Sequence, residues 1–216
     1  GSSISQDHFP NVKFDYMMTH PPFGLSFKSK KDIVLNESKD PSGRFSVGIP
    51  KVSNGSLLFL QSMISKMNPE GSRIGILLNS SPLFIGGHGS GESEIRKWII
   101  ENDWLECVVS LPDKLLFTSS IPTYIWILTN KKTDDRKDKV QLIDGSSFFK
   151  GNRFKNEITE EDRLSLIDLY LNFEENNYSK ILLNTSLGYT KVTIEQPLLD
   201  EDNKIVTDEN GNTLFD

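Results

Sequence analysis

The sequence predicts an α/β fold in which helices cover a mainly parallel sheet. Short, almost continuously apolar runs alternate with segments whose apolar residues recur every three or four positions. The length of 216 residues, of which 36% are hydrophobic and 25% charged, suits one globular domain or a large piece of one. No apolar run approaches membrane-spanning length and no signal-peptide pattern begins the chain, so we expect a cytoplasmic protein with no membrane contact.

The first predicted strand lies within residues 14–24, Phe-Asp-Tyr-Met-Met-Thr-His-Pro-Pro-Phe-Gly. Its aromatic and apolar residues favour a strand. The two prolines cannot continue a ladder and hold the backbone extended, and the final glycine lets the chain turn away. We expect a rigid shelf at a sheet edge that presents one polar side chain, His20, and one ring, Phe23. The simpler interpretation is a strand followed by an ordinary turn.

Residues 25–54 are rich in Lys, Ser, Asp and Gly and only weakly periodic, which predicts a long surface excursion. Lys28, Lys30, Lys31 and Arg44 make this excursion locally basic. A loop of this length after a candidate site is often functional. Substrate contact and a solvated flexible loop both remain open.

The rest of the first 150 residues alternates between helix and strand patterns. Residues 56–67 predict a helix that Asn54 or Ser53 caps and that Pro-Glu-Gly at 69–71 ends. A second helix is expected at 92–101. Further strands are expected at 73–78, 105–111, 123–129 and 140–143.

The segment 151–216 differs in character and is predicted to be a small α+β extension of a first domain at 1–150. A helix at 159–173 opens with Thr159 and has Asp162 three residues later, similar to a capping box. Short strands are expected at 181–183 and 191–195. The turn cluster 208–212 lies between the hairpin arms 205–206 and 213–215. No internal repeat is apparent.

A glycine-rich segment at 86–91 stands between a strand and a helix, where phosphate-binding loops occur. Residues 81–85 intervene, however, and no second strand ending in an acidic residue follows at the usual distance. A nucleotide-binding oxidoreductase is therefore a minor alternative, and a mobile loop leading into a helix is favoured.

Other catalytic and metal-binding patterns are weak. The single cysteine, Cys107, lies in an apolar run and is expected to be a buried hydrophobe rather than a nucleophile. Three histidines and one cysteine show no metal-ligand spacing, so no metal is expected. No Gly-x-Ser-x-Gly elbow supports Ser-His-Asp catalysis.

The stretch Thr19–Gly24 resembles the Asn-Pro-Pro-Phe/Tyr motif of N6-adenine DNA methyltransferases, with His20-Pro21-Pro22-Phe23 in its place. Other segments follow in the family's order. Together they are similar to the modification (M) subunit of type I restriction–modification systems, from about residue 12 to the C-terminus. These segments are 54–61, 73–78, 94–97, 111–117, 118–128, 142–144 and 189–198.

The resemblance implies the second half of a Rossmann-like, S-adenosylmethionine-dependent methyltransferase sheet. It also implies a mechanism in which the target adenine leaves the duplex. The side chain at His20 and the carbonyl of Pro21 would accept hydrogen bonds from the N6 amine, and Pro22 would keep the shelf rigid. Phe23 would stack on the base, beside Gly24. The amine would then attack the methyl group of S-adenosylmethionine.

Two features depart from the family's pattern. The family usually has Asn, Asp or Ser at His20, and a neutral imidazole offers one acceptor only in the right tautomer. We expect the His20 form to be much slower than an Asn form, or inactive; a catalytically inactive assembly module is the alternative. The family's glycine-rich cofactor motif precedes the shelf, but only thirteen residues precede Phe14. We therefore expect no measurable S-adenosylmethionine binding by the isolated chain, and an exposed first-strand edge.

The expected partners follow from the resemblance and agree with the charge. A net charge of −6 argues against a free-standing DNA binder, which is usually basic. DNA would be held with the help of a specificity (S) subunit, a second M subunit and, as a further candidate, the restriction (R) subunit. The DNA target itself would be read by the specificity subunit.

Overall fold

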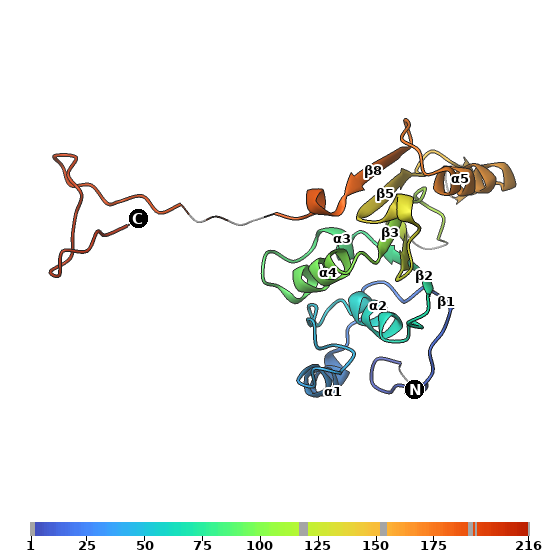
Figure 1. The fold of residues 1–216 in the computed structure, drawn as a ribbon, viewed down its shortest axis with the longest axis horizontal. Helices are drawn as coiled ribbons and strands as arrows, with labels where there is room; N and C mark the ends of the chain where they lie inside the picture. Colours follow the sequence, from blue (N-terminus) through green and yellow to red (C-terminus); the bar gives the residue numbers. More distant parts are fainter. Residues whose placement is uncertain (1–2, 117–120, 152–154, 190–191, 193, 216) are drawn as a thin grey trace.

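The computed structural model describes residues 3–116, 121–151, 155–189, 192 and 194–215 (Figure 1). A sheet of six strands forms its centre, in the order β1-β2-β4-β3-β5-β8. Four of these strands run in one direction, and β4 and β8 run the opposite way. The predicted α/β class is confirmed. The strands are β1 (Tyr16–Thr19), β2 (Arg73–Asn79), β3 (Leu105–Ser110), β4 (Thr123–Thr129), β5 (Lys139–Asp144) and β8 (Ser179–Leu183).

The predicted helices are present, with shifted ends. Helix α2 spans Ser56–Ile64, and Asn54 Oδ1 accepts a hydrogen bond from Ser56 N at 3.2 Å although Gly55 is the N-cap. Helix α4 spans Gly91–Glu101 and is capped by Ser90. Helix α5 spans Glu160–Asn172 and begins with the predicted capping box. The remaining short elements are α3 (Ser81–Phe84), η2 (Asp134–Arg136), β6 (Lys150–Gly151), β7 (Asn156–Glu157) and η3 (Asn184–Leu187).

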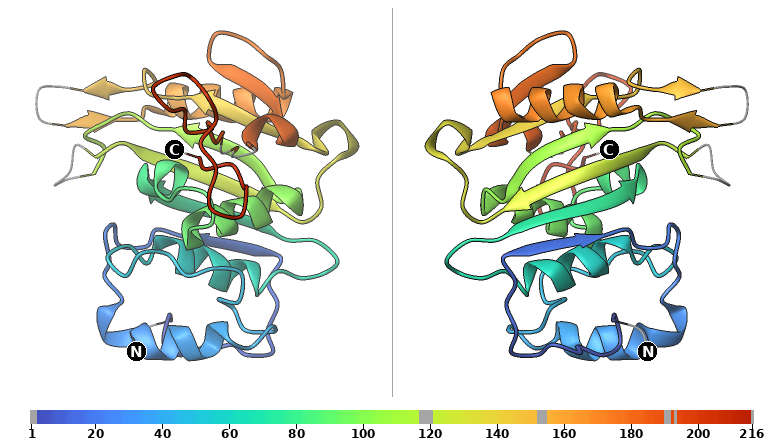
Figure 2. Two further views of the ribbon diagram at one scale, coloured as in Figure 1. Left: turned by 90° about the vertical axis from the view of Figure 1, so that its left-hand side faces the viewer. Right: turned by 90° about the vertical axis from the view of Figure 1, so that its right-hand side faces the viewer.

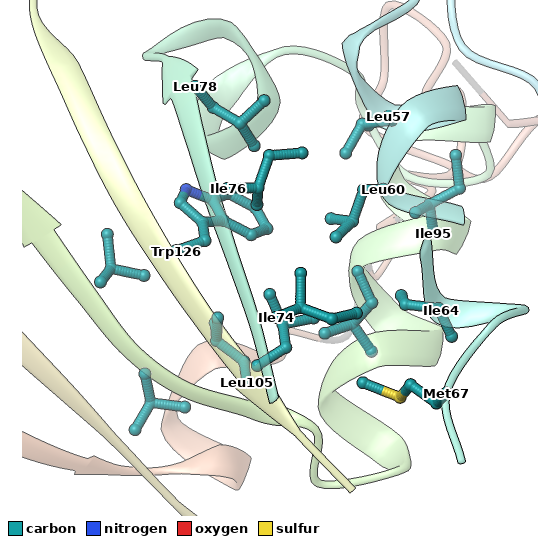
Figure 3. Close-up of a cluster of buried hydrophobic side chains, with 14 residues drawn as sticks. Leu57, Leu60, Ile64, Met67, Ile74, Ile76, Leu78, Ile95, Leu105 and Trp126 are labelled. Carbon is teal, nitrogen blue, oxygen red and sulfur yellow. The ribbon is translucent and has the colours of Figure 1, made fainter. Parts of the chain in front are cut away.

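The main hydrophobic core lies between the sheet and the helices α2 and α4 (Figure 3). Trp126 of β4 is its largest member, and the alternate residues Ile74, Ile76 and Leu78 of β2 face it. Leu105 and Val108 of β3 join it on either side of a register shift in that strand. Helix α5 covers the opposite face of β3 and β5, as the two views in Figure 2 show. Cys107 is fully buried on that second face, so the prediction that it is a packed hydrophobe is confirmed.

The interpretation of residues 25–54 as a solvated flexible loop is wrong, because this excursion is ordered. It contains η1 (Lys28–Lys30) and α1 (Lys31–Ser38). A second core of Ile4, Phe27, Val34, Phe45 and Leu58 joins it to the N-terminus and to α2. The excursion is therefore a packed layer of the protein.

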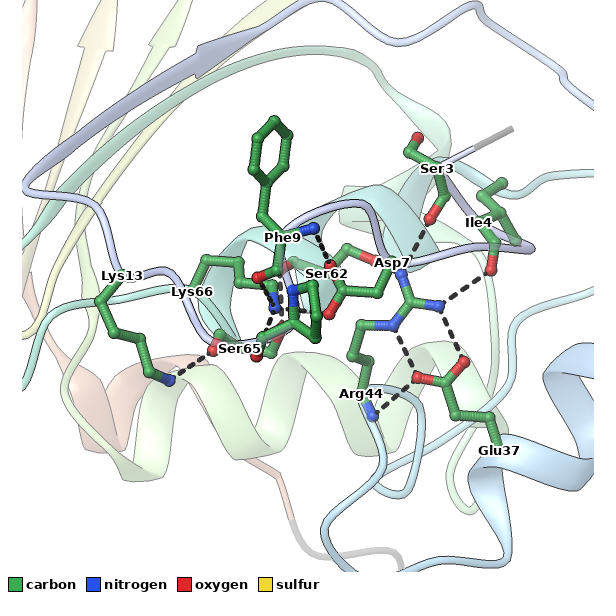
Figure 4. Close-up of polar contacts among 11 residues, drawn as sticks. Ser3, Ile4, Asp7, Phe9, Lys13, Glu37, Arg44, Ser62, Ser65 and Lys66 are labelled. Carbon is green, nitrogen blue, oxygen red and sulfur yellow. Dashed lines mark hydrogen bonds and ion pairs between the residues drawn. The ribbon is translucent and has the colours of Figure 1, made fainter. Parts of the chain in front are cut away.

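Charged groups fasten this layer to the N-terminal segment (Figure 4). Arg44 Nε lies 2.6 Å from Glu37 Oε1, and its guanidinium also donates to the carbonyls of Ser3 and Ile4. Lys66 Nζ lies 2.5 Å from Asp7 Oδ2. The positive charge of Arg44, predicted as part of a basic surface, is thus neutralised within the fold.

The C-terminal arm, residues 194–215, stretches away from the body (Figure 1). Single bridges join Thr207 to Thr213, as the predicted hairpin requires, and also Leu199 to Ile205. Of the predicted strand at 191–195, residues 191 and 193 lie outside the described part and the other three have no regular structure.

The arm repeats one turn, which the sequence analysis missed. Asp200 Oδ1 accepts hydrogen bonds from the backbone N–H of residues 202 and 204, and Asp208 Oδ1 from those of residues 210 and 212, eight positions later. Residues 192–216 contain seven Asp or Glu and one Lys, so this segment alone accounts for the net charge of −6. The preceding body is balanced in charge.

The first strand, β1, is the end of the sheet's described order and pairs only with β2 there. Its Tyr16 and Met18 side chains are 80% and 90% exposed. The expected apolar edge is therefore present. At the other end of the sheet, β8 and α5 pack against β5, so part of 151–216 continues the sheet; the boundary at 150 remains a prediction.

No helix in the described ranges combines the length and the apolar character that crossing a bilayer requires.

Candidate functional site

The shelf follows directly from the end of β1. Strand β1 stops at Thr19, and the next residues run without regular structure to Gly24. Pro21 is buried, whereas His20 and Pro22 are exposed and Phe23 is half-buried. Gly24 has a φ of +62°, in the left-handed region that a side chain disfavours, so the turn depends on glycine there. The predicted shelf is present.

His20 and Phe23 are packed together on this shelf. Their ring centroids are 5.0 Å apart and their planes are inclined by 55°. Pro21 and Pro22 separate the two residues in sequence, and their fixed φ angles restrict the backbone between the two rings. The structure thus brings together an imidazole and an aromatic ring on a stretch of chain that contains two prolines.

The shelf lies at the carboxyl edge of the parallel strands. Because β1 and β2 are parallel neighbours, Thr19 and Asn79 end at the same edge of the sheet. The register of β4 places Thr123 opposite Asn79, and Ser110 and Asp144 end β3 and β5 at this edge too. Ligands of open α/β sheets bind outside the carboxyl ends of the strands, so this edge is the candidate active edge.

A carboxylate is held at the same edge. Asp144 Oδ1 accepts hydrogen bonds from Ser110 Oγ at 3.0 Å and from Ser146 N at 3.0 Å. Hydrogen bonds from the Ser146 side chain and backbone, together with Ser110, hold the pKa of Asp144 below its usual value, against the opposing effect of burial. Asp144 ends the segment 142–144 of the family resemblance, but the sequence offers no reason to assign it to the site, because a single acid at a strand end is a weak signal.

A groove of about 1040 Å³ opens beside this edge, between α4 and the chain that follows β8. Val108, Val140 and Leu142 form its apolar floor, and Phe84 and Tyr124 lie among the residues that line it. None of the five residues predicted for the site, 20–24, lines the groove. The groove and the shelf are therefore separate features.

The glycine-rich segment 86–91 connects α3 to α4. Because α3 stands between β2 and this loop, the tight strand-to-helix turn of a dinucleotide fingerprint is absent there. A Cβ at Gly86 would lie 2.4 Å from Ser90 Oγ, whereas Cβ atoms at Gly87 and Gly89 would meet nothing within 4 Å. The absence of that turn from the described loop makes a nucleotide-binding oxidoreductase the less favoured interpretation, as in the sequence analysis.

Arg96 of α4 fastens this loop. Its guanidinium donates to the carbonyls of Pro82 at 3.0 Å, Ile85 at 2.7 Å and Gly86 at 3.0 Å. Burial lowers the pKa of Arg96 from its ordinary value, with Glu92 as the main opposing influence. The contacts of Arg96 could not be read from the sequence, where it is one helix residue among several charged ones.

No cluster of three or more His, Cys, Asp or Glu side chains suited to a metal ion occurs in the described ranges. The described residues ahead of β1 form turns and a single bridge at Phe14, not a strand–turn–helix. Residues 117–120, part of the segments that carry the family resemblance, lie outside the described residues.

Comparison with known proteins gives consistent matches. The family model described as "N-6 DNA Methylase" matches residues 1–196. The MjaIX type I restriction enzyme methylase subunit of Methanocaldococcus jannaschii is 30% identical over 196 residues, which are 90% of this chain and 34% of that protein. The HindI methylase subunit of Haemophilus influenzae is 32% identical over 167 residues, 77% of this chain and 35% of that protein. The chain thus spans about a third of the length of these relatives.

Solved structures share the fold. A type I restriction–modification methyltransferase subunit from Streptococcus thermophilus superposes with a TM-score of 0.74 at 23% identity, over 86% of this chain and 38% of that chain. The EcoKI M protein gives 0.53 at 23% identity, over 75% of this chain and 31% of that chain.

Proposed function

The chain belongs to the N-6 DNA methylase family, and on that premise we propose that it forms the target-base part of a type I modification subunit. The reaction would be site-specific transfer of a methyl group from S-adenosylmethionine to the N6 amine of an adenine in DNA. The observation that carries the proposal is the His20–Phe23 pair, held on two prolines at the carboxyl edge of the sheet.

The shelf supplies two kinds of contact to an adenine that has left the duplex. The N6 lone pair is shared with the purine ring, so the amine becomes a better nucleophile when its hydrogens are held by acceptors. The carbonyl of Pro21 and an acceptor at position 20 would do this. Phe23 would stack on the base, an interaction worth about 1–3 kcal/mol in related systems.

His20 fits this role less well than an amide does. Its imidazole has one acceptor nitrogen in the neutral form and none when protonated. It also lies against the ring that would receive the base. We infer that transfer by this chain's shelf is slow, or absent if the chain acts only as an assembly module.

We infer that the described residues alone do not form the family's site for S-adenosylmethionine. The glycine-rich loop 86–91 follows the helix α3 rather than a strand, so it lacks the strand–turn–helix of a nucleoside-binding motif. The free side of β1 lies beside the shelf, with Tyr16 and Met18 exposed. We propose that residues outside those described complete the donor site next to β1.

The balanced charge of the body supports a DNA grip that depends on partners. Non-specific DNA affinity comes mainly from Lys and Arg at phosphates, and the body has no net positive charge. The proposed partners are DNA, the specificity subunit, a second M subunit and the restriction subunit. The acidic arm would be repelled by phosphates.

The test is methylation by the complete subunit assembled with its specificity subunit. The complex is produced in a host without adenine methyltransferases, and N6-methyladenine in its DNA is measured by mass spectrometry. We expect the wild-type or the His20→Asn complex to methylate adenine. Adding Phe23→Ala to the active form should abolish this methylation. An assembled complex that methylates in neither form would reject the enzyme assignment and favour the assembly module.

A further inference from the structure

Phe84, a residue with no role in the proposed mechanism so far, ends α3 at the candidate active edge. It is 74% exposed, more than any other phenylalanine that the structure describes. Helix α3 follows β2 directly, and β2 is the parallel neighbour of β1. Phe84 and the shelf therefore lie beyond the ends of adjacent strands, as both views in Figure 2 show for α3 and β1.

The segment that carries Phe84 is anchored on both sides. Asn79 Oδ1 accepts a hydrogen bond from Ser81 N at 3.2 Å, which fixes the start of α3. After the helix, Arg96 donates to the carbonyls of Ile85 and Gly86 and, within the helix, to that of Pro82. An exposed phenylalanine is ordinary, but one whose backbone is held by a partly buried guanidinium is presented in a defined place.

The same segment is packed against the layer that supports the shelf. Pro82 and Ile85 line a small cavity together with Asn54 and Leu57. The neighbouring Gly55 N donates to Leu25 O at 2.8 Å, one residue after the shelf ends at Gly24. The segment that carries Phe84 and the residue that follows the shelf, Leu25, thus both adjoin the start of α2.

We propose that Phe84 is a second DNA-contacting ring, which enters the base stack beside the extruded adenine while Phe23 stacks on the adenine itself. The proposal rests on the proposed function. When a base leaves the duplex, its neighbours lose stacking and a gap opens. Other DNA-binding proteins insert apolar side chains between base steps, so an exposed ring suits such a gap. Phenylalanine has no polar atoms with which to read a base, so this contact suits any sequence. Arg96 is the positioning residue for the ring.

The experiment uses the complete complex with its specificity subunit. The recognised motif is first mapped by sequencing DNA methylated by the wild-type or His20→Asn complex. Methyl transfer is then measured on a duplex with the target adenine paired to thymine and on one with the adenine opposite an abasic site. Phe84→Ala should lower kcat/KM on the paired duplex by about 5- to 100-fold. The abasic duplex should restore most of this loss, because its adenine is already unpaired.

Three variants keep the test selective. Phe84→Trp retains a ring and should retain activity on the paired duplex. Arg96→Lys keeps the charge but loses the planar fork, and should give a smaller defect that is also confined to the paired duplex. Phe9→Ala removes a phenylalanine that is 56% exposed ahead of β1, at the opposite edge, and should leave both rates unchanged.

Each remaining outcome would overturn the proposal. Equal losses on paired and unpaired targets would mean that Phe84 supports folding or, as a residue that lines the neighbouring groove, a protein contact. Unchanged activity of Phe84→Ala in a methylating complex would reject this inference alone. No methylation by either the wild-type or the His20→Asn complex would instead reject the proposed function, and this inference with it.

Discussion

The imidazole of His20 lies against the ring of Phe23, with the ring centroids 5.0 Å apart. An adenine that stacks on Phe23 has to compete with this contact. Asparagine is shorter and always offers a carbonyl acceptor. We expect His20→Asn to raise the rate of N6 methylation by the complete complex by at least about tenfold, roughly 1.4 kcal/mol in activation free energy. Equal rates before and after the change would contradict this role.

The isolated 216-residue chain should not bind S-adenosylmethionine measurably. The glycine-rich loop 86–91 follows the helix α3 rather than a strand, and among the described residues the free side of β1 has no partner strand. Isothermal titration calorimetry of the purified chain is the direct measurement. Micromolar binding to this chain alone would refute the prediction and would place a donor site within these residues.

Glu106 should be a large contributor to stability. It is 1% exposed, its carboxylate lies 3.2 Å from Arg73 Nη2, and Tyr170 donates to it at 2.5 Å. Arg136 Nε is 4.0 Å away and also buried. Glu106→Gln should lower the free energy of unfolding in urea by about 3 kcal/mol, because it leaves a buried guanidinium without its carboxylate.

Tyr170→Phe is the matched control for this network. It removes one hydrogen bond to the carboxylate but keeps the ion pairs, so it should cost only about 1.5 kcal/mol. A Glu106→Gln protein as stable as the wild type would show that the network contributes no net stability.

Cys107 should be inert in the folded protein. Burial raises the pKa of its thiol to about 12, with Arg136 acting weakly in the opposite direction. Because the folded pKa lies above the unfolded value, the stability associated with the neutral thiol is complete below about pH 9 and is lost as the pH rises towards 12. Ellman's reagent at pH 8 should react only after urea is added.

The matched variant for this pH dependence is Cys107→Ala. Between pH 9 and 10.5 the wild type should lose more unfolding free energy than the variant does. Parallel pH profiles of the two proteins, or rapid thiol reaction without urea, would show that the thiol is accessible.

Thr159 should stabilise α5 through its capping box. Asp162 N donates to Thr159 Oγ1 at 3.1 Å, and Thr159 N donates to Asp162 Oδ2 at 3.1 Å. Thr159→Ala should lower the protection of α5 amides from hydrogen exchange by about 1 kcal/mol. Ser165→Ala, in the middle of the same helix, should cause no loss because alanine is the better helix former. Similar effects of the two changes would exclude a cap-specific contribution.

Local patterns predicted the local structure well. The strand predicted at 123–129 has those bounds in the structure, and the shelf was identified because its residues are contiguous. The sequence did not predict that the excursion at 25–54 is packed and partly helical. Its core residues Phe27, Val34 and Phe45 are far apart in a polar segment and follow no helical or strand period. Their partners, Ile4 and Leu58, lie outside it.

Site features that depend on long-range contacts were also missed. Asp144 and Phe84 reach the active edge only through the strand order, which periodicity does not encode. The role of Arg96 depends on three carbonyls 10 to 14 residues earlier in the chain. Tertiary packing, rather than composition, decides all three positions.

The position of β4 between β2 and β3 has a consequence for synthesis on the ribosome. Strands β2 and β3 are made first, but neither can pair with the other, because both pair with the later β4. Trp126, the largest side chain of the main core, also arrives with β4. Until residue 129 leaves the exit tunnel, two apolar strands have open edges. The nascent chain is therefore most exposed to chaperones and to aggregation from the emergence of β3 until residue 129 has left the tunnel.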